Sequence, residues 1–94
     1  MDLKRLLKLK EVLEDFMESL EIDGVCGFWT TLDEENLNHP DKEFTGSELA
    51  VYLVLDTKKR NFENRGNVRN DVRAMIKDYL NIDVYVGSIG KNCD

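Results

Sequence analysis

The stretch Leu49-Ala50-Val51-Tyr52-Leu53-Val54-Leu55 is the longest apolar run of the chain, and the rest of the fold can be arranged around it. Its length is typical of a strand. Apolar side chains at every position, rather than at alternate ones, are typical of a strand covered on both faces. We therefore predict a central strand over residues 49–55.

An amphipathic helix is predicted over residues 2–20. Apolar side chains recur there at spacings of three and four residues, which places them on one stripe of a helix. Gly24 follows as a terminator, because glycine readily adopts the left-handed conformation found at helix ends. The stripe consists of Leu6, Leu9, Leu13, Phe16 and Leu20, widened by Leu3, Val12 and Met17.

Two further strands and a second helix complete the predicted elements. Residues 25–32 are rich in β-branched and aromatic side chains, and residues 82–86 alternate apolar and polar side chains, so both segments predict strands. Residues 56–66 are predicted to form a charged turn, after which Asn67 caps the second helix. The apolar face of that helix contains Val68, Val72, Met75, Ile76 and Tyr79.

The predicted order is α-β-β-α-β, an α+β fold in which the helices pack on a small, mostly antiparallel sheet. The chain of 94 residues shows no repeat or linker, so we expect a single domain over residues 1–94. The connection over residues 33–46 is long for a compact domain, which indicates a functional or mobile segment.

Composition limits the classes of protein to which the chain can belong. Hydrophobic residues make up 41% and charged residues 34%, an ordinary globular balance. No apolar run approaches the roughly 20 residues that cross a bilayer, and the amino terminus lacks the apolar core of a signal peptide, so we predict a cytoplasmic protein without membrane contact.

Cys26 is expected to be a small core residue, and Cys93 is expected to lie in a tail. Both cysteines are expected to be reduced, because the cytoplasm is a reducing compartment. With His39 as the single histidine, no metal site and no cofactor are predicted.

The acidic residues are concentrated in the middle of the chain. The net charge is −6, yet the segment from Glu11 to Glu48 contains twelve carboxylates and only one cation, Lys42. On the first helix the carboxylates follow the helical period and fall within a sector of about 120°, nearly opposite the leucines. They also lie toward the carboxyl end, where the helix dipole disfavours anions, so the layout lowers stability and indicates another constraint. A solvated helix face on an acidic protein is the alternative interpretation.

We predict that these carboxylates bind another protein by imitating the phosphates of DNA. B-DNA presents one phosphate per roughly 3.4 Å of axis on each strand, and a rigid acidic surface of similar spacing fits the cationic groove of a DNA-binding protein. Such a surface repels nucleic acid itself and needs no catalytic residue. The predicted partner-binding residues are Glu11, Glu14, Asp15, Glu18, Glu21, Asp33, Glu34, Glu35, Asp41 and Glu43.

A small nuclease is the alternative function. Pro40-Asp41 followed by Asp56-Thr57-Lys58 fits the PD…(D/E)xK pattern, in which paired carboxylates hold a magnesium ion and the lysine steadies the attacking water. The pattern is permissive, because a chain this rich in acids and lysines contains such spacings by chance.

Three other groups of residues are interpreted as structural. The basic residues Arg69, Arg73 and Lys77 share one face of the second helix, where a solvated face or pairing with the acid of another copy is expected. The segment 87–90 (GSIG) has too few glycines for a phosphate cradle. The remaining aromatic residues are expected in the core or in an interface, not in a base-stacking platform: Trp29, Tyr52, Tyr79 and Tyr85.

Residues 24–33 (GVCGFWTTLD) and 44–56 (FTGSELAVYLVLD), with the size and acidity of the chain, resemble the Arn family of anti-restriction proteins of T-even bacteriophages. The resemblance covers essentially the whole chain. It implies a homodimeric DNA mimic that blocks a host restriction endonuclease and binds the nucleoid protein H-NS, in the host cell cytoplasm. It also implies that the functional residues are surface carboxylates, which here are the acidic residues given above. The modest net charge and the basic second half depart from what a DNA mimic is expected to have.

Overall fold

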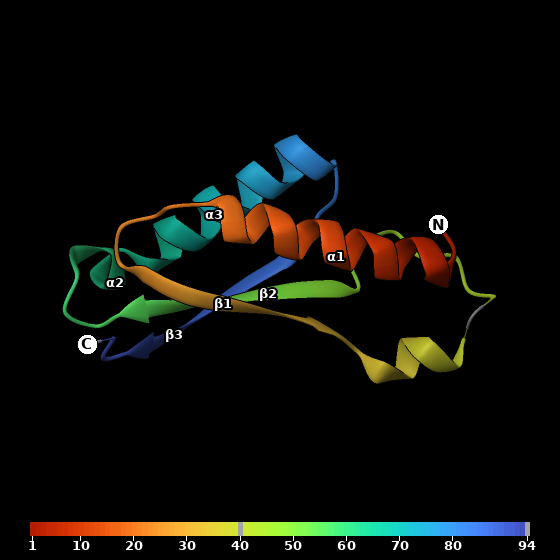
Figure 1. Cartoon of the computed structure of the whole chain (residues 1–94), viewed down its shortest axis with the longest axis horizontal. Helices are drawn as coiled ribbons and strands as arrows, with labels where there is room; N and C mark the ends of the chain where they lie inside the picture. The colour runs from red at the N-terminus through yellow and green to blue at the C-terminus, as the bar shows by residue number, and fades with distance from the viewer. Residues whose placement is uncertain (40, 94) are drawn as a thin grey trace.

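The protein, seen in a computed structural model that describes residues 1–39 and 41–93, has two long helices packed on one face of a three-stranded sheet (Figure 1). This arrangement confirms the predicted α+β class and the order of the main elements. The elements are α1 (Leu3–Ser19), β1 (Val25–Leu32), the 3-10 helix η1 (Glu34–Asn38), β2 (Leu49–Asp56), α2 (Arg60–Glu63), α3 (Arg65–Leu80) and β3 (Tyr85–Lys91).

The sheet has the order β1-β2-β3, so the predicted central strand is central. β1 pairs with β2 antiparallel, with Trp29 opposite Tyr52, and β3 pairs with β2 parallel, with Gly87 opposite Tyr52. The sheet is therefore mixed, and the prediction of a mostly antiparallel sheet was wrong in that respect. The reason is that α2 and α3 form a crossover, which returns the chain so that β3 runs in the same direction as β2.

A capping residue and an apolar stripe both favour a helix over the residues of α1. The Asp2 carboxylate caps its start by accepting a hydrogen bond of 2.9 Å from the Arg5 backbone N–H. The helix ends at Ser19, and Gly24 turns the chain into β1 with a φ of +82°. Leu6, Leu13 and Met17 are fully buried against the sheet, while the other residues of the predicted stripe are half-buried at its margins.

The predicted charged turn over residues 56–66 was wrong, because it contains α2 and the start of α3. The Phe62 ring lies close over Gly90 of β3, so this single apolar residue anchors a short helix in a charged segment. α3 buries the predicted residues Val68, Val72 and Ile76, but Met75 and Tyr79 are exposed. The helix ends at Asn81, which adopts the left-handed conformation with a φ of +57°.

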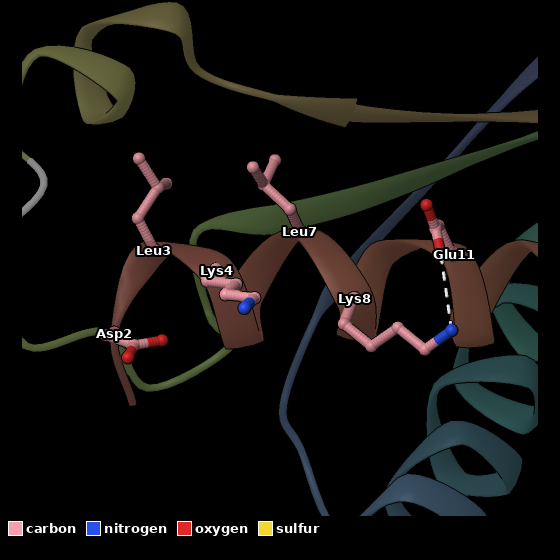
Figure 2. Close-up of a pocket in the computed structure, with 6 residues that line it drawn as sticks. All are labelled: Asp2, Leu3, Lys4, Leu7, Lys8 and Glu11. Carbon is pink, nitrogen blue, oxygen red and sulfur yellow. Dashed lines mark hydrogen bonds and ion pairs between the residues drawn. The ribbon is translucent and has the colours of Figure 1, made fainter.

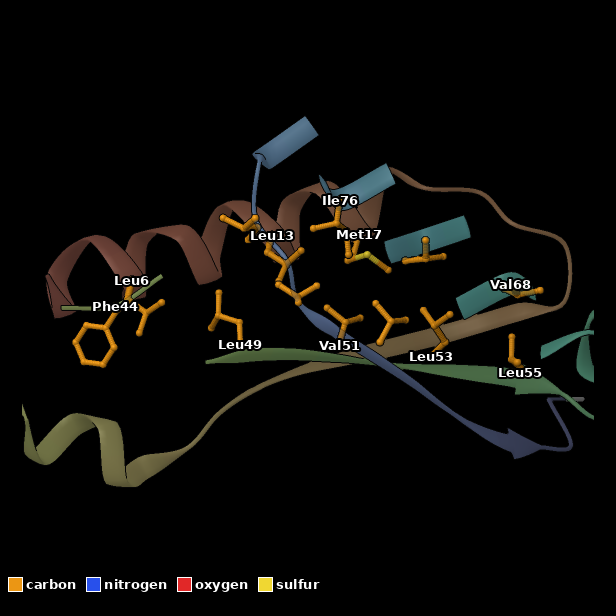
Figure 3. Close-up of a cluster of buried hydrophobic side chains, with 14 residues drawn as sticks. Leu6, Leu13, Met17, Phe44, Leu49, Val51, Leu53, Leu55, Val68 and Ile76 are labelled. Atoms are coloured by element: carbon orange, nitrogen blue, oxygen red, sulfur yellow. The ribbon is translucent and has the colours of Figure 1, made fainter. Parts of the chain in front are cut away.

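The core lies between the helices and the sheet (Figure 3). The β2 residues that point to this side, among them Leu49, Val51 and Leu53, are completely buried. They pack with Leu13 of α1 and Ile76 of α3 in one hydrophobic cluster. Fully burying such side chains contributes about 1.5–3 kcal/mol each, so this layer carries most of the stability of the fold.

The other face of β2 is not covered by a helix, although the apolar run predicted cover on both sides. Ala50, Tyr52 and Val54 alternate with the buried residues and are half-exposed. Both long helices lie on the opposite side of the sheet (Figure 1). Aromatic side chains partly shield this face instead, since the Trp29 ring stacks on Tyr52 with centroids 5.1 Å apart.

The last strand and the cysteines also differ from expectation. Ile82 and Val84 are buried in the connection before β3, which extends over Tyr85–Lys91 rather than 82–86. Cys26 is exposed, because an irregularity in the pairing of β1 between Val25 and Gly27 turns it outward. It forms a disulfide with Cys93, with Cα atoms 6.4 Å apart, so the expected core residue is in fact a link between β1 and the carboxyl-terminal tail.

Candidate functional site

The predicted acidic residues are accessible to a partner. Among the ten, Glu14 is half-buried and the others are exposed. They do not form one uninterrupted surface, however. The structure places them in two groups, one on the second half of α1 and one around η1 and the loop that follows it.

The first group is a row of carboxylates along α1. Glu11, Asp15 and Glu18 are exposed and follow one another at four and three residues, so they rise along the helix by about 5 Å per step. Glu11 accepts a hydrogen bond of 3.4 Å from the Lys8 ammonium, and this pair is well exposed. Glu21 lies beyond the end of α1 at Ser19, so it is outside the helical row to which the sequence assigned it.

Glu14 is the carboxylate that fixes this row against the sheet. It accepts hydrogen bonds from the Lys10 ammonium, at 2.7 Å, and from the Thr30 hydroxyl of β1. The Lys10 hydrogen bond, followed by that of Thr30, lowers the pKa of Glu14. The side chain is therefore ionised at neutral pH, and it holds α1 in a defined rotation over β1.

The second group lies where β1 ends and β2 begins. The Asp33 carboxylate caps η1 by accepting a hydrogen bond of 3.1 Å from the Glu35 backbone N–H, which leaves the Glu34 and Glu35 side chains exposed. Glu43 forms an ion pair of 2.7 Å with the ammonium group of Met1. Asp41 is exposed in the same loop.

The first half of α1 separates the two groups. An open hollow of about 630 Å³ lies there, and Figure 2 shows Leu3 and Leu7 directed to the same side of the helix, with Lys4 and Lys8 beside them. Asp2 and Glu11 also line the hollow, so its two carboxylates are balanced by the two lysines around an apolar centre. A partner that contacts both acidic groups must therefore also cross a strip without net charge.

The charge layout of α1 opposes its own dipole. The first turn holds no acidic residue and the last turn no basic one, while Lys4 and Arg5 lie near the start and Glu18 near the end. Each unfavourable charge costs about 0.3–1 kcal/mol at an exposed helix end. A function for the carboxylates would account for this layout.

The nuclease pattern is not assembled. Asp56 ends β2 and is almost buried, with its carboxylate accepting a hydrogen bond from the Lys58 backbone N–H at 3.0 Å. Asp41 precedes the other end of β2, and eight residues of strand extend over roughly 23 Å. Pro40 lies outside the described residues. Among residues 1–39 and 41–93, no group of three histidine, cysteine or acidic side chains is placed to hold a metal ion.

Arg69 and Lys77, two basic residues of α3, contact the molecule itself. The Arg69 guanidinium donates a hydrogen bond of 2.8 Å to the Ser88 hydroxyl, and Lys77 pairs with Asp83 at 3.4 Å. The glycines of residues 87–90 serve packing, because a Cβ on Gly87 would lie 2.7 Å from the Tyr52 ring. Neither feature forms a site for phosphate.

The sequence interpretation missed the uncovered face of the sheet. Trp29 and Tyr85 are 39% and 62% exposed, and their rings flank Tyr52 on this face. These residues were assigned to the core or to an interface. The available signal was the alternation of side chains along a strand, since Trp29 lies between the half-buried Phe28 and Thr30, which point to the helices.

Comparison with protein-family models, with curated proteins and with solved structures finds no match to this chain. In the described part of the chain, neither α1 nor any other helix is long and apolar enough to cross a membrane.

Proposed function

We propose that this protein is a DNA mimic that binds a DNA-binding protein through the carboxylates of α1. The single observation that carries the proposal is the exposed row Glu11, Asp15 and Glu18 on a helix that is held on the sheet by its buried apolar face and by the Glu14–Thr30 hydrogen bond. Because the row lies on a rigid helix, binding a partner costs little conformational entropy. Several simultaneous ion contacts favour a partner whose own ligand is a polyanion. The acidic residues around η1 add to the negative potential at one end.

In this proposal the natural partner is a host restriction endonuclease, with the nucleoid protein H-NS as a second partner. The protein would then act as an inhibitor that protects phage DNA in the cytoplasm of the host cell. It would work as a homodimer and use no catalytic residue and no cofactor. The partners and the location follow from the resemblance to the Arn family, and the acidic row of α1 supports the mode of binding.

Competition with DNA tests the proposal. A fluorescent DNA duplex is bound to purified H-NS, and in parallel plasmid is digested by a panel of restriction endonucleases, each with increasing amounts of this protein. We expect release of the duplex, or protection of the plasmid, that weakens steeply between 50 and 200 mM salt because several ion contacts form together. An absence of competition in every assay at low salt would overturn the proposal.

A matched pair of variants locates the surface. Glu11→Gln, Asp15→Asn and Glu18→Gln together should weaken competition by about tenfold or more, since three contacts are lost. Glu63→Gln, Asp71→Asn and Asp78→Asn remove the same charge from exposed positions of α2 and α3 and should have little effect. Glu14 is left intact because it also holds α1 on β1. Equal loss in both triple variants would show that only net charge matters.

A further inference from the structure

A pocket opens where α1 passes into β1, beside the last carboxylate of the acidic row. It has a volume of about 290 Å³, and we call it the α1–β1 pocket. Met17 of α1 and Leu53 of β2 line it, are exposed by only 4% and 0%, and belong to the hydrophobic core (Figure 3). The pocket therefore leads from the surface to the core. The other apolar side chains that line it are half-buried: Leu20, Ile22, Val25 and Phe28.

The turn between α1 and β1 fixes one wall of this pocket. The Leu20 backbone N–H donates a hydrogen bond of 3.2 Å to the Met17 carbonyl. The Val25 N–H donates one of 3.0 Å to the Ile22 carbonyl. Gly24 allows the turn with its φ of +82°. Because the backbone on this side is already held in place, filling the pocket costs little conformational entropy.

The mouth of the pocket is acidic. Among the lining residues, Glu18 is the one with a charged side chain. The exposed carboxylates of Glu21 and Asp23 lie in the adjoining turn, and the segment 16–27 contains no lysine or arginine. Lys59 packs against the same turn but does not line the pocket. An apolar group that enters here is therefore favoured when cations lie beside it.

The size of the pocket limits the kind of ligand that fits. Pockets that enclose a whole small molecule have volumes of about 300–1,000 Å³, whereas this pocket has about 290 Å³ and is open to solvent on one side. It accommodates a single large aliphatic or aromatic side chain. In protein interfaces, side chains of this kind that fill a pocket inside a polar rim contribute most of the binding free energy.

We propose that the α1–β1 pocket receives one large apolar side chain of the protein that binds the acidic row. Glu18 belongs both to the row and to the lining of the pocket, so one segment of the partner reaches both. That segment carries arginine or lysine next to the apolar residue. The inference rests on the proposed function for the position of the partner. It adds the chemistry of the partner, since basic residues alone do not complete the contact.

This contact has no counterpart in DNA, whose backbone presents phosphates and sugars. The charges of the acidic row give an affinity that decreases with salt, whereas burial of an apolar side chain gives an affinity that does not. Fully burying one such side chain raises affinity by about tenfold or more. The partner would therefore hold this protein at salt concentrations that weaken its complex with DNA.

Two synthetic peptides test the inference directly. Each has capped ends and two arginines on either side of a central residue, which is leucine in one peptide and serine in the other. We expect fluorescence anisotropy of the labelled peptides at low salt to show that the leucine peptide binds at least about tenfold more tightly. Methyl NMR should locate the leucine peptide at Ile22 and Val25. Equal affinities, or leucine-specific shifts at Leu3 and Leu7 instead, overturn the inference.

Two variants change the pocket in opposite ways. Ile22→Ser removes part of its apolar wall and Ile22→Trp fills it, and circular dichroism verifies that each is folded. Both should reduce the preference for the leucine peptide to less than about threefold, with the affinity for the serine peptide unchanged because the carboxylates remain. Leu7→Ser, which removes an exposed apolar side chain near the other end of α1, should keep the full preference. A preference that survives in both Ile22 variants overturns the inference.

Competition with DNA separates this inference from the proposed function. Where the protein displaces DNA from H-NS or protects plasmid from an endonuclease, Ile22→Ser should weaken that competition by a similar factor at about 50 and 200 mM salt, since no charge is lost. Neutralising Glu11, Asp15 and Glu18 should instead reduce its salt dependence. Competition that Ile22→Ser leaves unchanged overturns the inference and leaves the proposed function standing. Competition absent from every assay overturns the proposed function, and the preference between the two peptides then decides the inference.

Discussion

The ring of Trp29 stacks on that of Tyr52 across the β1–β2 pair, with centroids 5.1 Å apart and planes inclined by 14°. Tyr85 meets the same Tyr52 ring edge-on at 5.9 Å. Three strands are thus joined by aromatic contacts on the face that the helices leave open. Such pairs contribute about 0.5–1.5 kcal/mol beyond the area they bury, so this face adds to stability even in the monomer.

Gly87 should tolerate no larger side chain, because the Tyr52 ring occupies the place of its Cβ. A Cβ there would lie 2.7 Å from the ring. We expect Gly87→Val to displace Tyr52, weaken the near-ultraviolet circular dichroism of the stacked rings, and lower the free energy of unfolding by about 1–3 kcal/mol. Gly27→Ala is the control, since its nearest neighbour would be 3.9 Å away. Unchanged spectra for Gly87→Val would contradict the packing described for Tyr52.

Glu14→Gln should change how stability depends on pH. The pKa of Glu14 is lowered in the folded protein by the hydrogen bonds from Lys10 and Thr30. A lowered pKa contributes stability that is present above the unfolded value of about 4.3 and is lost as pH falls through the folded value. Urea unfolding should therefore show wild type more stable than Glu14→Gln at pH 7, with a difference that decreases as the pH falls below the unfolded value. Glu63→Gln serves as the control for an exposed carboxylate, and a difference that does not change with pH would argue against ionisation as its cause.

The Cys26–Cys93 disulfide should stabilise the oxidised protein. It closes a loop between residues 67 positions apart, for which the chain-entropy model gives about 4 kcal/mol. Unfolding of the wild type should require less urea once a reductant is added, whereas the double variant Cys26→Ser, Cys93→Ser should be insensitive to reductant. In the proposed cytoplasmic location the pair would be kept reduced, so activity should not depend on the bond. Equal midpoints for the wild type with and without reductant would exclude this contribution.

Leu13→Ala tests the helix–sheet core. Leu13 is completely buried among residues of α1, α3 and β2, and removing a buried leucine costs about 2–5 kcal/mol. Leu7→Ala, on the same helix but 41% exposed, should cost less than about 1 kcal/mol. Thermal unfolding followed by circular dichroism at 222 nm provides the comparison. Similar losses for both variants would place the core on a different face of α1.

Sequence patterns predicted the elements that local periodicity determines. The stripe around Leu6 and Leu13 located α1 to within a residue at each end, and the β-branched run located β1 at Val25–Leu32. The direction of β3 was not predictable in this way, because it depends on how the crossover through α3 packs. α2 was missed because its anchor, Phe62, contacts Gly90, a residue far along the chain.

The candidate site was predictable only in part. The helical period correctly indicated that Glu11, Asp15 and Glu18 share an exposed side of α1. Their separation from Glu34 and Glu35 depends on where η1 lies in space. The spacing of these residues in the sequence does not predict that position. The open face of the sheet was hidden for a similar reason, since Tyr52 and Val54 are as apolar as the buried residues between them.

The parallel pairing of β2 with β3 has a consequence for how the chain reaches its native state. Val51 and Val86 are neighbours in the sheet although 35 positions separate them, so this ladder closes a long loop that contains α2 and α3. Contacts of such long range slow folding, and β3 is expected to be the last strand to arrive. Until then β2 offers an unpaired apolar edge, and it is at this stage, before the native state is reached, that the chain is most exposed to aggregation.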